Sequence, residues 1–123
     1  VNNSSESQLA TQSLLSKKPD VFFALPDNVI FASFETIVKS CNVSHIPIFT
    51  SEAGLVSRGA VASYGADFYQ WGFQAGEQAA QFLKEKSLAN LKPEIVKVRM
   101  RVYNSAVAKQ FGIVPGKDFV PIK

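Results

Sequence analysis

The stretch DVFFALPDNVIFASFETIVKS, Asp20 to Ser40, decides the fold. It begins with a short apolar run, from Val21 to Leu25, which is typical of a strand covered on both faces in a parallel sheet. Pro26 ends this run, and the pattern then changes at once to that of a helix. In open α/β sheets, ligands usually bind at the carboxyl end of a strand, so this junction is a candidate binding position.

The helical pattern begins directly after this proline. Asp27 or Asn28 supplies a side-chain oxygen that can accept hydrogen bonds from the free backbone donors of a first turn. Apolar residues then recur at helical spacing as far as Cys41. The sequence therefore predicts a strand, a tight turn and a helix from residue 28 to about residue 41.

Composition and charge exclude several classes of protein. With 123 residues, of which 46% are hydrophobic and 19% charged, the chain is typical of one globular domain. No window approaches the roughly 18 uninterrupted apolar residues of a transmembrane helix. The N-terminal VNNSSESQ lacks the basic and apolar regions of a signal peptide. The net charge is +3, but the basic residues are scattered without interleaved aromatics, so we expect no nucleic-acid partner.

The single cysteine excludes further chemistry. Cys41 has no second cysteine with which to form an intrachain disulfide or a multi-cysteine metal site. It falls on the apolar side of the expected helix, so we expect it to act as a small hydrophobic residue of the core. His45 precedes an expected strand without a second histidine or cysteine nearby, so we expect no metal-binding or general-base role for it.

The rest of the chain alternates strands and helices. A first helix is expected to open at Ser4 or Ser5, with Gln8 as capping-box partner and an inner face that includes Leu9 and Leu14. The later expectations are strands at residues 45–49 and 60–65, a helix at 68–84 with Trp71 in the core, an alternating strand at about 95–104 and a helix ending near 111. We expect the alternating strand to lie at a sheet edge or between lobes, because only one of its faces is apolar.

This order predicts an α/β fold with a mainly parallel sheet flanked by helices, in three layers of the Rossmann-like kind. The loops after the three buried strands should converge on one edge of the sheet. They read LPDN, FTSEAG and YGADFYQWG, and each contains a carboxylate: Asp27, Glu52 or Asp67.

Several stretches resemble a known family. NNSSESQLATQSL, DVFFALPDNVIFASFETIVK, IPIFTSEAGLVSRGAVASYGADFYQWGFQAGEQAAQFL and VYNSAVAKQFGI are similar, in order, to the substrate-binding proteins of bacterial ABC importers with the type I periplasmic-binding fold. The similarity is to the branch that includes tryptophan- and tyrosine-binding proteins. It implies a receptor whose two α/β lobes close over a ligand. Residues 1–67 would form part of the second lobe, and residues 68–123 a crossover helix, linker, strand and C-terminal helix that complete or bridge the lobes.

The resemblance also implies a ligand site. The family's loops match seven positions of this sequence: Pro26, Asp27, Asn28, Ser51, Glu52, Asp67 and Tyr69. In this reading Asp27 faces the ammonium group of an amino acid and Asn28 faces its polar groups. Helix N-termini and hydroxyls accept the ligand's carboxylate, and aromatic residues cover its side chain.

The implied protein performs no chemistry and needs no cofactor or metal. Its partners would be a small ligand and a membrane permease, and it would work outside the cytoplasm, in a periplasm or lipid-anchored at the cell surface. An amino acid is expected, with aromatic ones favoured and branched-chain ones still open. Because most of a first lobe has no counterpart here, we expect a fragment without its targeting segment that binds ligand weakly by itself. Its exposed sheet edge could pair with another copy of the chain.

Three other readings stay open. Asp27 and Asp67 are the residue type that caps helices in most proteins, so they could be caps alone. The three carboxylates could form an acid/base or Mg²⁺ site of a small α/β hydrolase or phosphoryl-transfer domain, and their convergence would decide that question. The chain could also belong to the ligand-sensing domain of a transcription regulator.

Overall fold

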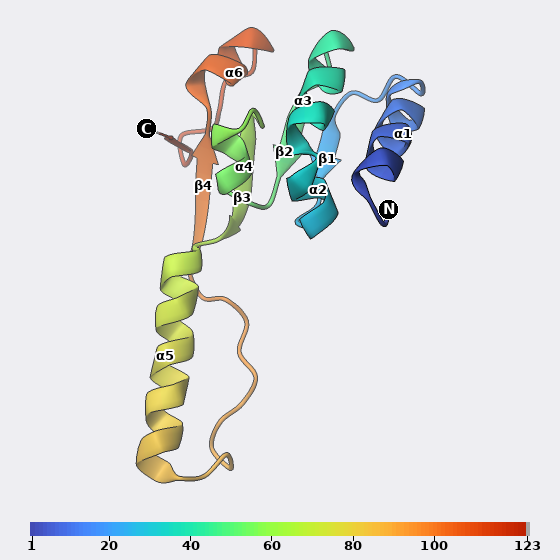
Figure 1. Ribbon diagram of the computed structural model, residues 1–123. Helices are drawn as coiled ribbons and strands as arrows, with labels where there is room; N and C mark the ends of the chain where they lie inside the picture. Colours follow the sequence, from blue (N-terminus) through green and yellow to red (C-terminus); the bar gives the residue numbers. More distant parts are fainter. Residues whose placement is uncertain (123) are drawn as a thin grey trace.

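The computed structural model describes residues 1–122. The elements are α1 (Ser4–Leu15), β1 (Phe22–Ala24), α2 (Asn28–Ala32), α3 (Phe34–Val43), β2 (Ile48–Thr50), α4 (Gly54–Ser57), β3 (Ala62–Ala66), α5 (Phe68–Glu85), β4 (Arg99–Tyr103), α6 (Ser105–Gln110) and β5 (Val120–Pro121). Figure 1 shows a body that holds the sheet and most helices, and a long α5 that extends away from it. We call residues 1–67 and 99–122 the body, and residues 68–98 the arm.

One five-stranded sheet organises the body. Its order is β1-β2-β3-β4-β5, with β1, β2 and β3 parallel to one another. β4 runs antiparallel to β3 and pairs with β5 on its other side. The expected α/β fold with a mainly parallel sheet is confirmed. The alternating strand is not the edge of the sheet, because β5 pairs with its residues Val102 and Tyr103, so this alternative of the prediction is wrong. The other alternative, a position between lobes, stays a prediction.

The sheet separates two apolar clusters. Alternating residues of the strands point to opposite faces, so Ile48 and Val102 join one cluster while Phe49 and Tyr103 join the other. The larger cluster packs against α1, α3 and α4 and includes the fully buried Phe34, Ile37, Cys41, Leu55 and Val56. The smaller cluster packs against α6. Helices on both faces give the three layers that the sequence predicts.

Strand β1 is less covered than the sequence predicts. Phe22 and Ala24 are buried, but Phe23 between them is 54% exposed and Leu25 is 65% exposed. Within residues 1–122, β1 pairs only with β2, so its outer edge is open. A mostly apolar groove of about 320 Å³ follows this edge, between β1 and α1. The expected exposed edge is present, while the prediction that β1 is covered on both faces is wrong.

Helix α1 is turned differently from the prediction. The helix begins at Ser4, as predicted, but its cap is Asn3, whose side chain accepts a hydrogen bond from the Glu6 backbone at 2.9 Å, and not the predicted capping box with Gln8. Its buried residues are Ser7, Thr11 and Leu15, whereas Leu9 is 67% exposed and Leu14 is 48% exposed. The buried positions follow an i, i+4 spacing, and two of them are polar, so counting apolar residues selects the wrong face.

The helix expected from residue 28 to 41 is two helices. The break lies at Ser33, where φ is −104° and ψ is 7°, and the Ser33 hydroxyl donates to the Val29 carbonyl. A hydroxyl that bonds back to a preceding carbonyl competes with the helical pattern. The result is a short α2 after the Pro26 turn and a separate α3 that enters the core. Cys41 is buried on α3, as predicted.

The arm is built on α5 and the segment that returns along it. The only buried residue among those of α5 is Gln74. Trp71, which the sequence places in the core, is 45% exposed, and this prediction is wrong. No helix within residues 1–122 is long and apolar enough to cross a membrane. The predicted division into residues 1–67 and 68–123 stays a prediction, and Lys123, the last residue of the second predicted range, lies outside the described part.

Candidate functional site

The candidate site lies along the edge of the sheet where β1, β2 and β3 end. These strands are parallel neighbours, so the loops that follow them lie side by side at the same edge. Figure 1 shows α5 leaving the body from this edge. The three loops therefore form a rim between the body and the arm.

The first loop presents Pro26, Asp27 and Asn28 to solvent. All three residues are exposed. The Asp27 carboxylate accepts hydrogen bonds from the backbone N–H groups of Val29 at 2.8 Å and Ile30 at 3.3 Å. Both bonds end on Oδ1, so Asp27 caps α2 with one carboxylate oxygen. The predicted cap is confirmed.

The second loop places Ser51 and Glu52 after β2. Both residues are half-buried, and the Glu52 carboxylate accepts a hydrogen bond from the Leu55 N–H at 3.2 Å, in the first turn of α4. The buried Thr50 hydroxyl donates to the Ala24 carbonyl at 2.9 Å and accepts from the Glu52 N–H at 3.2 Å. Thr50 therefore connects the end of β1 with the loop that carries Glu52.

The third loop carries Asp67 and Tyr69. The half-buried Asp67 accepts a hydrogen bond from the Gln70 N–H at 3.1 Å and so caps α5. Its own N–H donates to the Val98 carbonyl at 3.1 Å, so Asp67 lies where the arm leaves and where it returns. Tyr69 is 80% exposed at the start of α5.

A close backbone approach joins the second and third loops. A Cβ atom on Gly65 would overlap the carbonyl oxygen of Ser51. Only glycine allows the end of β3 to lie this near to the end of β2. Gly65 thereby sets the distance between the loop of Glu52 and the loop of Asp67.

The three carboxylates share one arrangement. Asp27, Glu52 and Asp67 each follow a parallel strand and accept a hydrogen bond from the first turn of the next helix. Negative groups are favourable at helix N-termini, and a row of them at one rim attracts a cation such as an ammonium group. The sequence identified these three residues, but it missed Thr50 and Gly65, which hold the loops together. The available signal was their position in the sequence: Thr50 directly precedes Ser51, and Gly65 lies two residues before Asp67.

The rim does not form a metal centre. Within the described residues, no group of three His, Cys, Asp or Glu side chains is placed to hold a metal ion. Cys41 is no candidate nucleophile either, because burial raises the pKa of its thiol to about 11 and keeps it protonated. This geometry gives the metal-dependent enzyme alternative no support.

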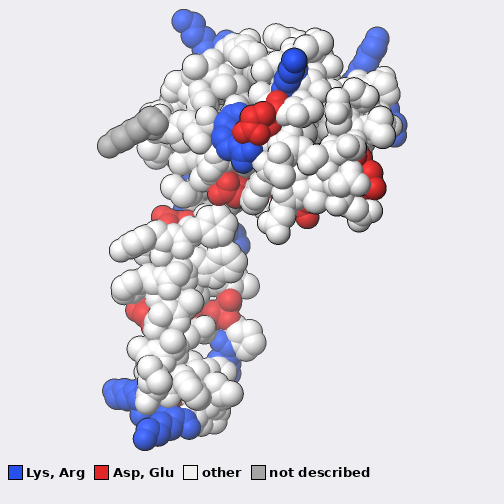
Figure 2. Space-filling view, viewed as in Figure 1, with Lys and Arg blue, Asp and Glu red and all other residues white. Residues whose placement is uncertain are grey.

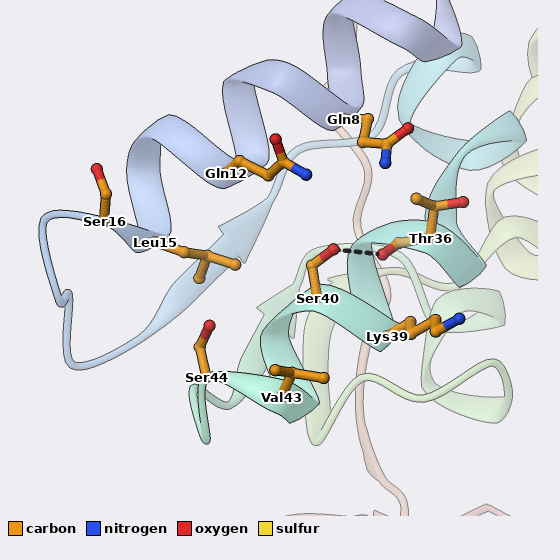
Figure 3. Close-up of a pocket in the computed structure, with 9 residues that line it drawn as sticks. All are labelled: Gln8, Gln12, Leu15, Ser16, Thr36, Lys39, Ser40, Val43 and Ser44. Atoms are coloured by element: carbon orange, nitrogen blue, oxygen red, sulfur yellow. Dashed lines mark hydrogen bonds between the residues drawn. The ribbon is translucent and has the colours of Figure 1, made fainter.

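A larger hollow lies elsewhere. A groove of about 680 Å³ lies between α1 and α3. Figure 3 shows Gln8 and Gln12 on one side of it and Thr36, Lys39 and Ser40 on the other. The Ser40 hydroxyl donates to the Thr36 carbonyl at 3.0 Å, within its own helix. None of the seven predicted site residues lines this groove, so it is separate from the candidate site.

The fold and the rim define a class of protein, the α/β lobes that bind small molecules at the carboxyl ends of parallel strands. Residues 1–118 match the family model described as ABC transporter substrate binding protein. The chain belongs to this family, whose members are binding proteins and not enzymes. The predicted resemblance is thus confirmed.

Individual relatives agree with this assignment. The chain is 40% identical over 91 residues to a tyrosine-binding protein of Clostridioides difficile, a match that covers 74% of this chain and 26% of the relative. A conserved domain protein of Vibrio cholerae has a TM-score of 0.83 at 31% identity, with 100% of this chain and 43% of that chain covered. A protein from Streptococcus pneumonia in complex with L-Trp has a TM-score of 0.83 at 26% identity, with coverage of 100% and 44%.

A third solved structure shares the fold alone. It is a ligand-free, open substrate-binding protein with adhesive properties from Clostridium difficile, with a TM-score of 0.75 at 24% identity. This chain covers 42% of it. The chain thus spans about a quarter of the curated relative and less than half of each of the three solved structures.

Proposed function

We propose that this chain forms most of the second lobe of a two-lobed receptor that binds an amino acid between its lobes and delivers it to the permease of an ABC importer. The observation that carries the proposal is the rim, where three loops with one carboxylate each lie side by side at the carboxyl ends of β1, β2 and β3. The tyrosine-binding relative and the neighbour bound to L-Trp favour an aromatic amino acid.

Each predicted residue has a proposed role. Asp27 pairs with the ligand's ammonium group through the carboxylate oxygen that does not cap α2. Asn28 and Ser51 offer hydrogen bonds to its polar groups, and Glu52 and Asp67 add negative charge at the same rim. Pro26 and Tyr69 supply exposed apolar surface next to these groups.

The exposed arm supports the proposal of a two-lobed receptor. Aromatic and aliphatic side chains along α5 are exposed, among them Phe68, Trp71, Phe73, Phe82 and Leu83. Figure 2 shows the arm standing away from the body, with white surface between acidic patches along it and basic residues at its far end. Contiguous exposed apolar surface marks a site of contact with another protein surface. We propose that the first lobe covers α5 and supplies the opposite wall of the ligand cleft.

Closure of the two lobes would couple binding to transport. The ligand would stabilise the closed state because it contacts both lobes at once. The receptor would work outside the cytoplasm, where an importer collects its substrate. This chain alone would bind ligand weakly or not at all, because it holds only one wall of the cleft.

Calorimetric titration of the two-lobed protein with L-tryptophan, L-tyrosine and L-phenylalanine tests the proposal. We expect saturable binding of at least one of them, and a loss of about tenfold or more in affinity with Asp27→Ala, because a charge-assisted contact to the ammonium group is removed. Asp20→Ala, which removes an exposed carboxylate of the body that is not among the rim residues, is the control and should leave affinity unchanged. Absence of binding in a folded protein would contradict the aromatic assignment.

A further inference from the structure

Arg58 connects two of the three helices that begin at the rim. It follows the last turn of α4, and its guanidinium reaches across to α2 and α3. Its Nε and Nη2 donate to the Glu35 carboxylate at 2.8 and 2.9 Å, and Nη2 also donates to the Phe31 carbonyl at 2.6 Å. The guanidinium carbon lies 5.4 Å from the ring centroid of Phe34. The Arg58 side chain thus contacts Phe31 in α2 and both Phe34 and Glu35 in the first turn of α3.

Helix α2 needs such support. It has five residues, and none of them is fully buried. So short a helix is not stable by its own hydrogen bonds. Its attachments include the Asp27 cap, the partly buried Ile30 and Phe31 that pack on the core, the neighbouring helix α1, and the bond from Arg58 to the Phe31 carbonyl.

The other end of this connection is the second rim loop. Helix α4 begins at Gly54, and the N–H of its second residue, Leu55, donates to Glu52. A movement of α4 therefore moves Glu52 and Arg58 together. The contact of Arg58 with α2 transmits the position of α4 to the helix that Asp27 caps.

We propose that Arg58 is a positioning residue that fixes the distance between Asp27 and Glu52 across the ligand rim. The inference rests on the proposed function, since it assigns these two carboxylates to the ligand. Arg58 acts through α2 and does not contact the ligand, because it lies at the end of α4 opposite to Glu52.

The role depends on geometry more than on charge. The side chains of Arg58 and Glu35 are 35% and 69% exposed, and an ion pair so open to solvent contributes little to global stability. The planar guanidinium, however, uses two nitrogens, Nε and Nη2, to bond both carboxylate oxygens and a carbonyl, and the single nitrogen of a lysine ammonium does not reproduce this fixed fork. Loss of Arg58 should therefore weaken binding without a matching loss of stability.

The test uses the two-lobed protein with Arg58→Met, Arg58→Lys and Glu35→Gln, and with Lys39→Met as control. Lys39 is an exposed cation on α3 that takes no part in this connection. Affinity for L-tryptophan and L-tyrosine is measured by calorimetry, hydrogen exchange of α2 by mass spectrometry, and unfolding by urea. The exchange measurement needs no ligand, so it reports on the connection even if binding fails.

We expect Arg58→Met to weaken binding about fivefold or more and to speed exchange in α2 by a similar factor, with a nearly unchanged unfolding midpoint. Arg58→Lys should have an affinity and an α2 exchange rate between those of Arg58→Met and wild type. Lys39→Met should match wild type in both measurements. Unchanged affinity and unchanged α2 exchange in Arg58→Met would overturn the inference, as would a loss of affinity that only follows a loss of stability. A wild-type protein that binds neither amino acid would instead contradict the aromatic assignment of the proposed function, and faster α2 exchange in Arg58→Met would then still show the connection.

Discussion

In the body the apolar face of α3 is buried, whereas in the arm the apolar face of α5 lies in solvent. Phe34, Ile37 and Cys41 of α3 are fully buried under the sheet and its neighbouring helices. Phe68 and Phe82 of α5 are 56% and 41% exposed. Both helices have the same kind of amphipathic sequence. The difference shows that periodicity predicts which face of a helix is apolar, while the surface that covers this face can come from another part of the assembly.

The two regions are also held by different forces. The body has a continuous core on each face of its sheet. The arm is held to its returning segment mainly by polar contacts: Gln74 donates to Glu94 at 2.8 Å and to the Ile95 carbonyl at 3.0 Å, and accepts from the Lys97 N–H at 3.1 Å. Burial of apolar surface is the dominant stabilising term in folding, so the body should be the stable unit of this chain.

Phenylalanine truncations should show the largest difference between the regions. Phe34→Ala in the body leaves a cavity where no solvent reaches, and should destabilise the chain by about 3–5 kcal/mol. Phe73→Ala in the arm removes a side chain that is 60% exposed, and should change stability by less than about 0.5 kcal/mol. Urea unfolding of both variants measures the contrast, and equal losses would contradict it.

Gly65→Ala should be the next most damaging change. Its new methyl group would overlap the Ser51 carbonyl, and a backbone atom cannot rotate away as a side chain can. We expect a loss of about 3 kcal/mol with separation of the second and third rim loops. Urea unfolding measures the loss, and near wild-type stability would show that the strands are able to shift.

Gly72→Ala should have opposite effects on stability in this chain alone and in the two-lobed protein. A Cβ on Gly72 meets nothing within 4 Å among the described residues, so alanine should stabilise α5 by about 1 kcal/mol in this chain alone. In the two-lobed protein the same methyl group should be destabilising if the first lobe packs closely on this face. Helix content by circular dichroism and unfolding of both proteins measure the effect. The same sign in both would contradict close packing at Gly72.

The smallest effect concerns the surface of the body. The hydrogen bonds from Arg58 lower the pKa of Glu35 below its ordinary value of 4.5. Because the pKa is depressed in the folded state, the stabilisation by this pair is complete above pH 4.5 and is lost as the pH falls through the lower, folded-state value. The difference in urea midpoint between wild type and Glu35→Gln should therefore be present at about pH 7 and should shrink as the pH is lowered below 4.5. A difference that persists in acid would contradict this account.

Much of the fold could be predicted because local signals agree with it. The apolar run before Pro26, the caps at Asp27 and Asp67 and the alternation of strands and helices all point to one parallel sheet. The face of α1 was mispredicted because its buried residues include Ser7 and Thr11, whose burial depends on how closely α1 approaches α2 and α3. The exposure of Trp71 was mispredicted because it depends on the absence of a covering surface, which the periodicity of α5 does not reveal.

The candidate site was predictable in its charged groups and less so in its supports. Asp27, Glu52 and Asp67 follow three apolar runs in the sequence, so their convergence follows from the parallel order of the strands. Thr50, Gly65 and Arg58 act through contacts between residues far apart in the chain, such as that of Arg58 with Phe31 and Glu35. These contacts depend on tertiary structure, and no local sequence pattern predicts them.

The most direct test of the account is hydrogen exchange of α5, measured in this chain alone and in the two-lobed protein. If the arm belongs against a first lobe, its amides should exchange rapidly in this chain while those of β2 and β3 remain protected, and they should become protected when the first lobe is present. The account would be contradicted if α5 were as protected as the sheet in this chain alone. It would also be contradicted if the α5 amides exchanged rapidly in both proteins.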